Sequence, residues 1–179
     1  FGFYAAPLKN YEDKVVHKTA IGLLGSYTTV LDGISAGLGV GVVEENASWL
    51  MANALGNYIG GDADGFQLTF LLNYIEGNSG YIQITSLGNY VRGNFEGIQS
   101  SGVGNIVGGD LQGVQGAGVF NFTKGHADGI QASVANWAGE IDGIQAGVVN
   151  RAGTVQGMQV GLINIAGQMN GVPIGLINV

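Results

Sequence analysis

The sequence of 179 residues contains no cysteine, only two prolines and little charge. Without cysteine the chain has no disulfide, no thiolate metal ligand and no cysteine nucleophile. Charged residues make up 11% of the sequence, against roughly 25% in an average soluble protein. The six Lys and Arg and thirteen Asp and Glu give a net charge of −7, which would repel nucleic acids and anionic lipid headgroups. We therefore expect neither as a partner.

Long apolar runs are also lacking. No stretch approaches the 18 or so apolar residues that a transmembrane helix needs, so we expect no transmembrane segment. The sequence begins at Phe1 rather than Met and shows no leader with a cleavage site. We expect either an exported chain whose leader has been removed or a piece of a longer chain.

Glycine is abundant instead, at 34 residues, and hydrophobic residues make up 46% of the sequence. The hydrophobic content is too high for a disordered acidic tail, so the chain should fold. Glycine does not recur at every third position, which excludes collagen. A glycine excess without that spacing indicates either low complexity or a repeat.

A repeat runs through most of the chain. Glutamines recur at 16-residue and then 14-residue intervals, at Gln67, Gln83, Gln99, Gln115, Gln131, Gln145 and Gln159. Asparagines keep step with them at Asn73, Asn89, Asn105, Asn121, Asn136, Asn150, Asn164 and Asn178. A glycine precedes nearly every one of these glutamines by two residues, and Tyr81 is the exception in that series.

The units indicate a coil made of two strands and two corners. From Gln131 onward the Gln-to-Asn and Asn-to-Gln distances each shorten by one residue, so each half of the unit loses one, and we expect a narrower cross-section there. Unit starts fall at about ten positions from Gly33 to Gly171. We assign residues 1–32 to an N-terminal segment with a degenerate first coil and residues 33–179 to the repeats.

Strands fit these units better than helices do. Glycine at several positions per unit costs roughly 1 kcal/mol each in a helix interior, while Val and Ile favour strands. Ile144, Ala146 and Val148 alternate with Gln145, Gly147 and Val149, the two-residue period of a strand. We predict an all-β, single-domain parallel β-solenoid of about ten coils of 14–16 residues, forming a rod roughly 50 Å long at strand spacing.

Identical Asn or Gln side chains stacked at strand spacing can bond along the axis. We expect the Asn column at a corner, where Asn suits tight turns. The Gln column would stack for stability, with a polar binding face as the alternative.

The last three units, GIQAGVVN, GMQVGLIN and GVPIGLIN, resemble the bacterial surface-repeat proteins built from tandem Gly-apolar-Gln-x-Gly-apolar-apolar-Asn units. The match is close over residues 129–179, looser over 65–125 and weak over 1–64, and the 16-residue units depart from the 14-residue pattern. The resemblance implies an exported bacterial protein with a repetitive β fold, displayed at the cell surface. It carries no catalytic motif to transfer.

Residues for chemistry are sparse, and we predict a non-enzyme with no catalytic, cofactor or metal site. The two histidines, His17 and His126, stand in unrelated contexts. Asp32, Asp64, Glu96, Asp128 and Asp142 each precede a glycine that opens a unit. Stacked like charges at Asp128 and Asp142 could attract a divalent cation, so a calcium-binding edge is the alternative to solvated corner residues.

We expect the functional contacts of the protein at the ends of the rod. The repeat continues to Leu176, Ile177 and Val179 without a capping element, and open strand edges can pair with other chains. The aromatic Phe1, Phe3 and Tyr4 open the chain. We predict a subunit of a head-to-tail extracellular filament at the bacterial surface, with these six residues in the contact between copies.

The alternative function is a monomeric surface adhesin or carbohydrate-binding module, with a surface glycan as its partner. The aromatic residues Tyr58, Tyr74, Tyr81, Tyr90 and Trp137 could stack on sugar rings. An enzyme ranks third, because side chains used in ladders are not free to converge in a pocket.

Overall fold

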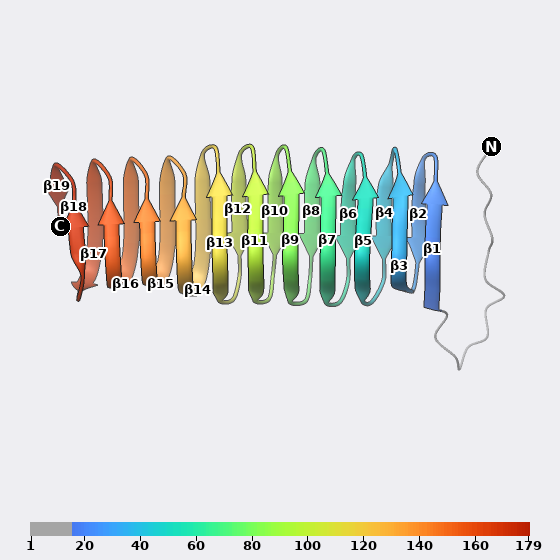
Figure 1. Cartoon of the computed structure of the whole chain (residues 1–179), viewed down its shortest axis with the longest axis horizontal. Helices are drawn as coiled ribbons and strands as arrows, with labels where there is room; N and C mark the ends of the chain where they lie inside the picture. Colours follow the sequence, from blue (N-terminus) through green and yellow to red (C-terminus); the bar gives the residue numbers. More distant parts are fainter. Residues whose placement is uncertain (1–15) are drawn as a thin grey trace.

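A computed structural model describes residues 16–179, which wind into a parallel β-solenoid of about ten turns (Figure 1). The predicted all-β fold is confirmed, and no helix occurs within this range. In the coils up to residue 117, a long strand lies on one face and a short strand on the other. The strands are β1 (Val16–Gly22), β2 (Gly25–Thr28), β3 (Val30–Gly37), β4 (Val40–Val43), β5 (Ala47–Asn53), β6 (Gly56–Ile59), β7 (Ala63–Thr69), β8 (Leu72–Ile75), β9 (Ser79–Thr85), β10 (Gly88–Val91), β11 (Phe95–Ser101), β12 (Gly104–Val107), β13 (Leu111–Ala117), β14 (Phe120–Ala132), β15 (Ala135–Ala146), β16 (Val149–Val160), β17 (Ile163–Met169), β18 (Val172–Ile174) and β19 (Ile177–Asn178).

Every pairing between strands is parallel and joins equivalent segments of successive coils. Long strands pair with long strands, as β5 with β7, and short with short, as β6 with β8. The first coil, β1 and β2, precedes the unit that opens at Gly33 and pairs with β3 and β4. Repetition of sequence therefore becomes repetition of position along the axis, and each residue of a unit stands in a column of equivalents.

The shorter units close their coils more tightly. Leu111 pairs with Ala127, sixteen residues on, whereas Asn136 pairs with Asn150, fourteen on. The register between β14 and β15 shifts between Thr123 and His126, where one residue of the corner is lost. From β14 to β16 the strand continues round this corner without a break, and the coils are smaller (Figure 1).

The interior of the rod has an apolar half and an amide half. The apolar half is a cluster of buried side chains from the start of each long strand and the end of each short one: Leu31, Val43, Ala47, Ile59, Ala63, Ile75, Val91, Phe95, Val107, Leu111, Ala127, Ala138, Ile141, Ala152 and Val155, with Met51 joining them. The amide half holds the Gln and Asn columns, which are buried as well. Alternation along each strand turns every second column of side chains inward.

Glycine recurs where the chain bends inside the long segment. Gly143 has φ of 138°, and a Cβ atom there would lie 2.0 Å from the carbonyl oxygen of Gly129 in the preceding coil. Only glycine meets both conditions without strain. The glycine two residues before nearly every ladder glutamine thus lets successive backbones approach to strand spacing.

Candidate functional site

The glutamine column forms a buried ladder of side-chain hydrogen bonds. Gln99 Nε2 donates to Gln83 Oε1 at 2.8 Å, and the same 2.8 Å bond recurs from Gln115, Gln131, Gln145 and Gln159 to the preceding glutamine. These side chains are 0–2% exposed. Because they face one another and not solvent, they stack for stability, and a polar binding face made of them is excluded.

The two ends of the glutamine ladder differ. At the N-terminal end the Ser79 hydroxyl accepts from Gln83 Nε2 at 3.0 Å and donates to Gln67 Oε1 at 3.5 Å. At the other end Gln159 Oε1 is buried with no hydrogen-bond partner among residues 16–179. Its neighbour in the next coil is Pro173, whose side chain offers no donor.

The asparagine ladder runs with the opposite polarity. Each Asn Nδ2 donates to the Oδ1 of the next asparagine along the chain at 2.8–3.0 Å, from Asn57 to Asn178. Glutamine donors therefore point toward the N-terminus and asparagine donors toward the C-terminus. Each coil thus offers side-chain donors and acceptors on both of its faces.

The position of the asparagines corrects one expectation. They do not lie at a corner: Asn73, for example, is the second residue of β8 and is buried. The side chain still serves the adjoining turn, since Asn105 Nδ2 donates to Gly116 O at 2.9 Å. A buried strand position is possible because the amide bonds both to its neighbour in the ladder and to a backbone carbonyl.

Two further ladder residues were not predicted from the sequence. Asn57 stands sixteen residues before Asn73 and donates to it at 2.9 Å. Asn53 then donates to Asn57 Oδ1 at 2.8 Å. A Cβ at Gly41 would lie 2.2 Å from Asn53 Nδ2, so Asn53 occupies the space that an asparagine at position 41 would fill.

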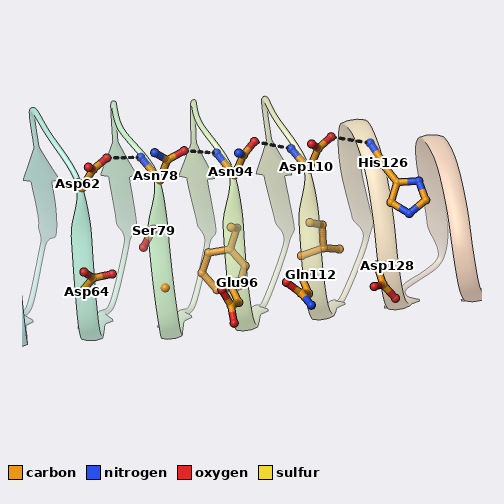
Figure 2. Close-up of a pocket in the computed structure, with 13 residues that line it drawn as sticks. Asp62, Asp64, Asn78, Ser79, Asn94, Glu96, Asp110, Gln112, His126 and Asp128 are labelled. Atoms are coloured by element: carbon orange, nitrogen blue, oxygen red, sulfur yellow. Dashed lines mark hydrogen bonds between the residues drawn. The ribbon is translucent and has the colours of Figure 1, made fainter.

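A second polar column lines one corner of the 16-residue coils (Figure 2). In it the side-chain oxygen of each residue accepts from the backbone N–H of its equivalent in the next coil at 2.7–2.9 Å. Its members are Asn46, Asp62, Asn78, Asn94 and Asp110, and the last of them, Asp110, accepts from the N–H of His126. The 16-residue interval was visible in the sequence, but alternation between Asn and Asp concealed the column.

Beside this corner column lies a shallow groove of about 570 Å³, lined mainly by two neighbouring columns of residues, the first of which is the corner column itself (Figure 2). The second of them is the acidic column expected from the sequence, with Asp64, Gly80, Glu96, Gln112 and Asp128 in successive coils. Asp128 is paired in register with Asp142. Within residues 16–179, no three His, Asp or Glu side chains come together as a metal site would require.

The histidines lie far apart along the rod, in β1 and β14. His126 Nδ1 lies 3.5 Å from Glu140 Oε2 in the next coil, and both side chains are partly exposed. The structure does not bring the two histidines together.

Most of the aromatic residues considered for sugar binding are occupied with one another. Tyr74 stacks between Tyr58 and Tyr90, with ring centroids 5.5 and 4.9 Å apart. Burial against these rings, with the nearby Glu76 carboxylate, raises the pKa of Tyr74. Trp137 has the Arg151 guanidinium 4.7 Å from its ring centroid. The three tyrosine rings stack along the short-strand side of the rod, and Trp137 is contacted by Arg151 rather than by these rings.

Trp49 and Tyr81 differ from the other aromatic residues. They occupy the glycine column, in register with Gly65 between them, yet have φ of 84° and 75°. Such angles are strained for bulky residues. Both side chains are exposed, at 69% and 64%. Trp49 Nε1 donates to Asp32 Oδ1 at 3.1 Å, and the pKa of Asp32 is lowered by its hydrogen bond from Lys18, with a smaller contribution from Trp49.

The six residues predicted for a contact between copies fall into two groups. Phe1, Phe3 and Tyr4 lie outside the described residues. Leu176, Ile177 and Val179 are exposed in the coil formed by β18 and β19. The contact itself stays a prediction.

Comparison with known proteins assigns no family. No family model, curated protein or solved structure matches this sequence. None of the described residues belongs to a helix suited to crossing a membrane.

Proposed function

We propose that the protein is a non-catalytic structural protein of the bacterial surface, whose copies join head to tail in an extracellular filament. The proposal rests on one observation: successive coils contact one another through matching donors and acceptors, so the same contact repeats from coil to coil along the axis. The glutamine donors of each coil bond to the glutamine acceptors of the preceding coil, and the asparagine donors bond to the asparagine acceptors of the next coil. In the last coil the asparagine column is continued by Asn178, whose amide can donate to a coil of a second copy, whereas the glutamine column ends at Gln159 with Pro173 beyond it.

The polar interior supports a structural role. The buried amides bond to their equivalents in neighbouring coils. The location rests on the resemblance of residues 129–179 to bacterial surface-repeat proteins. No cofactor is required by this function.

Negative-stain microscopy of the purified chain tests the filament. We expect continuous fibres from the full chain and shorter or no fibres after removal of residues 1–8. In Asn178→Asp a carboxylate replaces the outward amide donor, so fibres should be lost. Gln112→Asp adds the same charge on the exposed acidic column and should leave them intact. Single rods from every form would refute head-to-tail assembly.

A second candidate is a carbohydrate-binding module, favoured by Trp49 and Tyr81. Backbone strain tends to be retained where it serves a function, and glycine, the usual residue of this column, would remove it. The two exposed rings stand two coils apart, about 9.6 Å at strand spacing, and the neighbouring column places carboxylates in the coils before, between and after them, at Asp32, Asp64 and Glu96. Together, aromatic faces and carboxylate acceptors suit a chain of sugar rings.

A glycan array tests this candidate. We expect binding that is lost in Trp49→Gly and Tyr81→Gly while both variants become more stable. Tyr74→Phe, within the stacked tyrosines, serves as the control and should bind as the wild type does. An array without a hit would dismiss the module.

A further inference from the structure

Charge is segregated across the rod. In every coil, one stretch is free of Asp, Glu, Lys and Arg: the second half of the long strand, the turn after it and the first residue of the short strand. These stretches are residues 19–25, 34–40, 50–56, 66–72, 82–88, 98–104, 114–120, 130–135, 144–149, 158–163 and 172–177. We call this surface the apolar edge; its turns run along the top of the rod in Figure 1.

The apolar edge is exposed and bulky. In the coil of β7 and β8, Phe66, Leu68, Phe70 and Leu72 are 48%, 37%, 65% and 53% exposed. The next coil adds Ile84. Soluble monomers rarely expose a contiguous apolar surface of this extent, and a larger one marks an interaction site.

We propose that the apolar edge pairs laterally with the same edge of a second copy, the two rods being related by a two-fold axis. About ten coils at 4.8 Å, by about six residues at 3.3 Å, give a surface of roughly 1,000 Å² per copy. A stable protein interface needs about 800 Å² per partner. The edge is therefore large enough to hold a dimer without help from other surfaces.

The distribution of charge favours a second copy over a bilayer as the partner of the apolar edge. Pairing edge to edge leaves the acidic columns of both copies on the outer sides, so the net charge of −7 on each copy opposes association least in this arrangement. A bilayer fits poorly, because interfacial apolar surfaces are usually flanked by Lys and Arg. Here the basic residues of the described range are Lys18, Arg92, Lys124 and Arg151, and none lies on the apolar edge.

The geometry of the apolar edge also favours a second copy as its partner. The outward residues of the edge repeat at strand spacing, so two such surfaces can interdigitate as paired sheets do. A two-fold axis makes the contact isologous, so it closes at two copies. Lateral pairing uses the sides of the rods and is independent of the end contacts of a filament.

Sedimentation on the Asn178→Asp background tests lateral pairing with end contacts suppressed. We expect a dimer that dissociates at least tenfold more readily when Leu68→Lys puts a charge on the edge. Gln112→Lys, which has the same net charge, should remain dimeric. A monomer across the whole concentration series, before any edge substitution, overturns the proposal.

The absence of cysteine allows an independent test that does not depend on how Leu68→Lys folds. Val103 lies midway along the edge, in the turn between β11 and β12, and is 40% exposed. Under mild oxidation Val103→Cys should give a covalent dimer, whereas Gln112→Cys should not. Equal cross-linking of the two variants argues against an edge contact. Flotation with phosphatidylcholine vesicles that is blocked by Leu68→Lys would assign the edge to a bilayer instead.

Discussion

The 16-residue and 14-residue coils differ in their turns and in their apolar half, and agree in their amide half. The corner after the short strand holds an Asn or Asp side chain in the longer coils, and continuous strand in the shorter ones. On the apolar side, Val91 and Val107 give way to Ala138 and Ala152. The glutamine bonds remain 2.8 Å in both regions.

The difference shows which part of the cross-section tolerates change. A hydrogen bond along the axis depends on distance and direction, so every coil must place its amides at the same point. Apolar contacts are non-directional, and their column can shrink when the corner loses a residue. Two deletions per unit are therefore accommodated by the turns and the apolar side chains.

Replacing the glycine two residues before a ladder glutamine should cause the largest loss of stability. The loss should be the same in the 16-residue and the 14-residue coils. In Gly143→Ala the new Cβ meets the carbonyl oxygen of Gly129, and φ is unfavourable. We expect a loss of more than about 4 kcal/mol in the free energy of unfolding, the range of severe backbone and packing conflicts. Urea denaturation measures it. Gly116→Ala is the control, because a Cβ at Gly116 meets nothing within 4 Å.

Interrupting the glutamine ladder where the 16-residue coils give way to the 14-residue coils should cause the second-largest loss of stability. Gln131 donates to Gln115 and accepts from Gln145, so Gln131→Leu leaves a buried donor and a buried acceptor without their ladder partners. We expect a loss of about 3 kcal/mol. Gln159→Leu breaks one ladder bond and removes an oxygen that has no partner in the described range, so its loss should be about 1 kcal/mol. Equal losses would show that the ladder adds nothing beyond burial.

The period of the repeat was enough to predict the fold, because a fixed interval forces equivalent residues into columns. Asn57 was missed although its interval is regular, because Met51 takes the place of a glutamine in its own unit. Tyr81 is an exception in the glycine series, but its positive φ could not be predicted from residue types. The apolar edge emerges only when the turns are placed on one side of the rod.

The apolar half should distinguish the two regions most directly. Ala138→Val puts into a 14-residue coil the side chain that a 16-residue coil holds in this column, and overpacking should cost about 1–3 kcal/mol. Val107→Ala makes the reverse change and should cost about 2 kcal/mol through the cavity it leaves. Thermal unfolding measures both. A neutral Ala138→Val would mean that the smaller coils are not more tightly packed.

The polar corner column should give the smallest effect, confined to the longer coils. Asp110 Oδ1 accepts from the His126 N–H at 2.8 Å, so Asp110→Ala leaves that backbone donor to water and should cost about 1 kcal/mol. Thr154 stands in the same column of a 14-residue coil, where the strand itself pairs with the next coil at Gln168. Thr154→Ala should therefore change the free energy of unfolding by less than about 0.5 kcal/mol. Urea titrations of both variants compare the two corners. Equal losses would mean that the backbone of the longer coils does not depend on its side-chain acceptors, and that the corner column is a surface feature rather than a structural one.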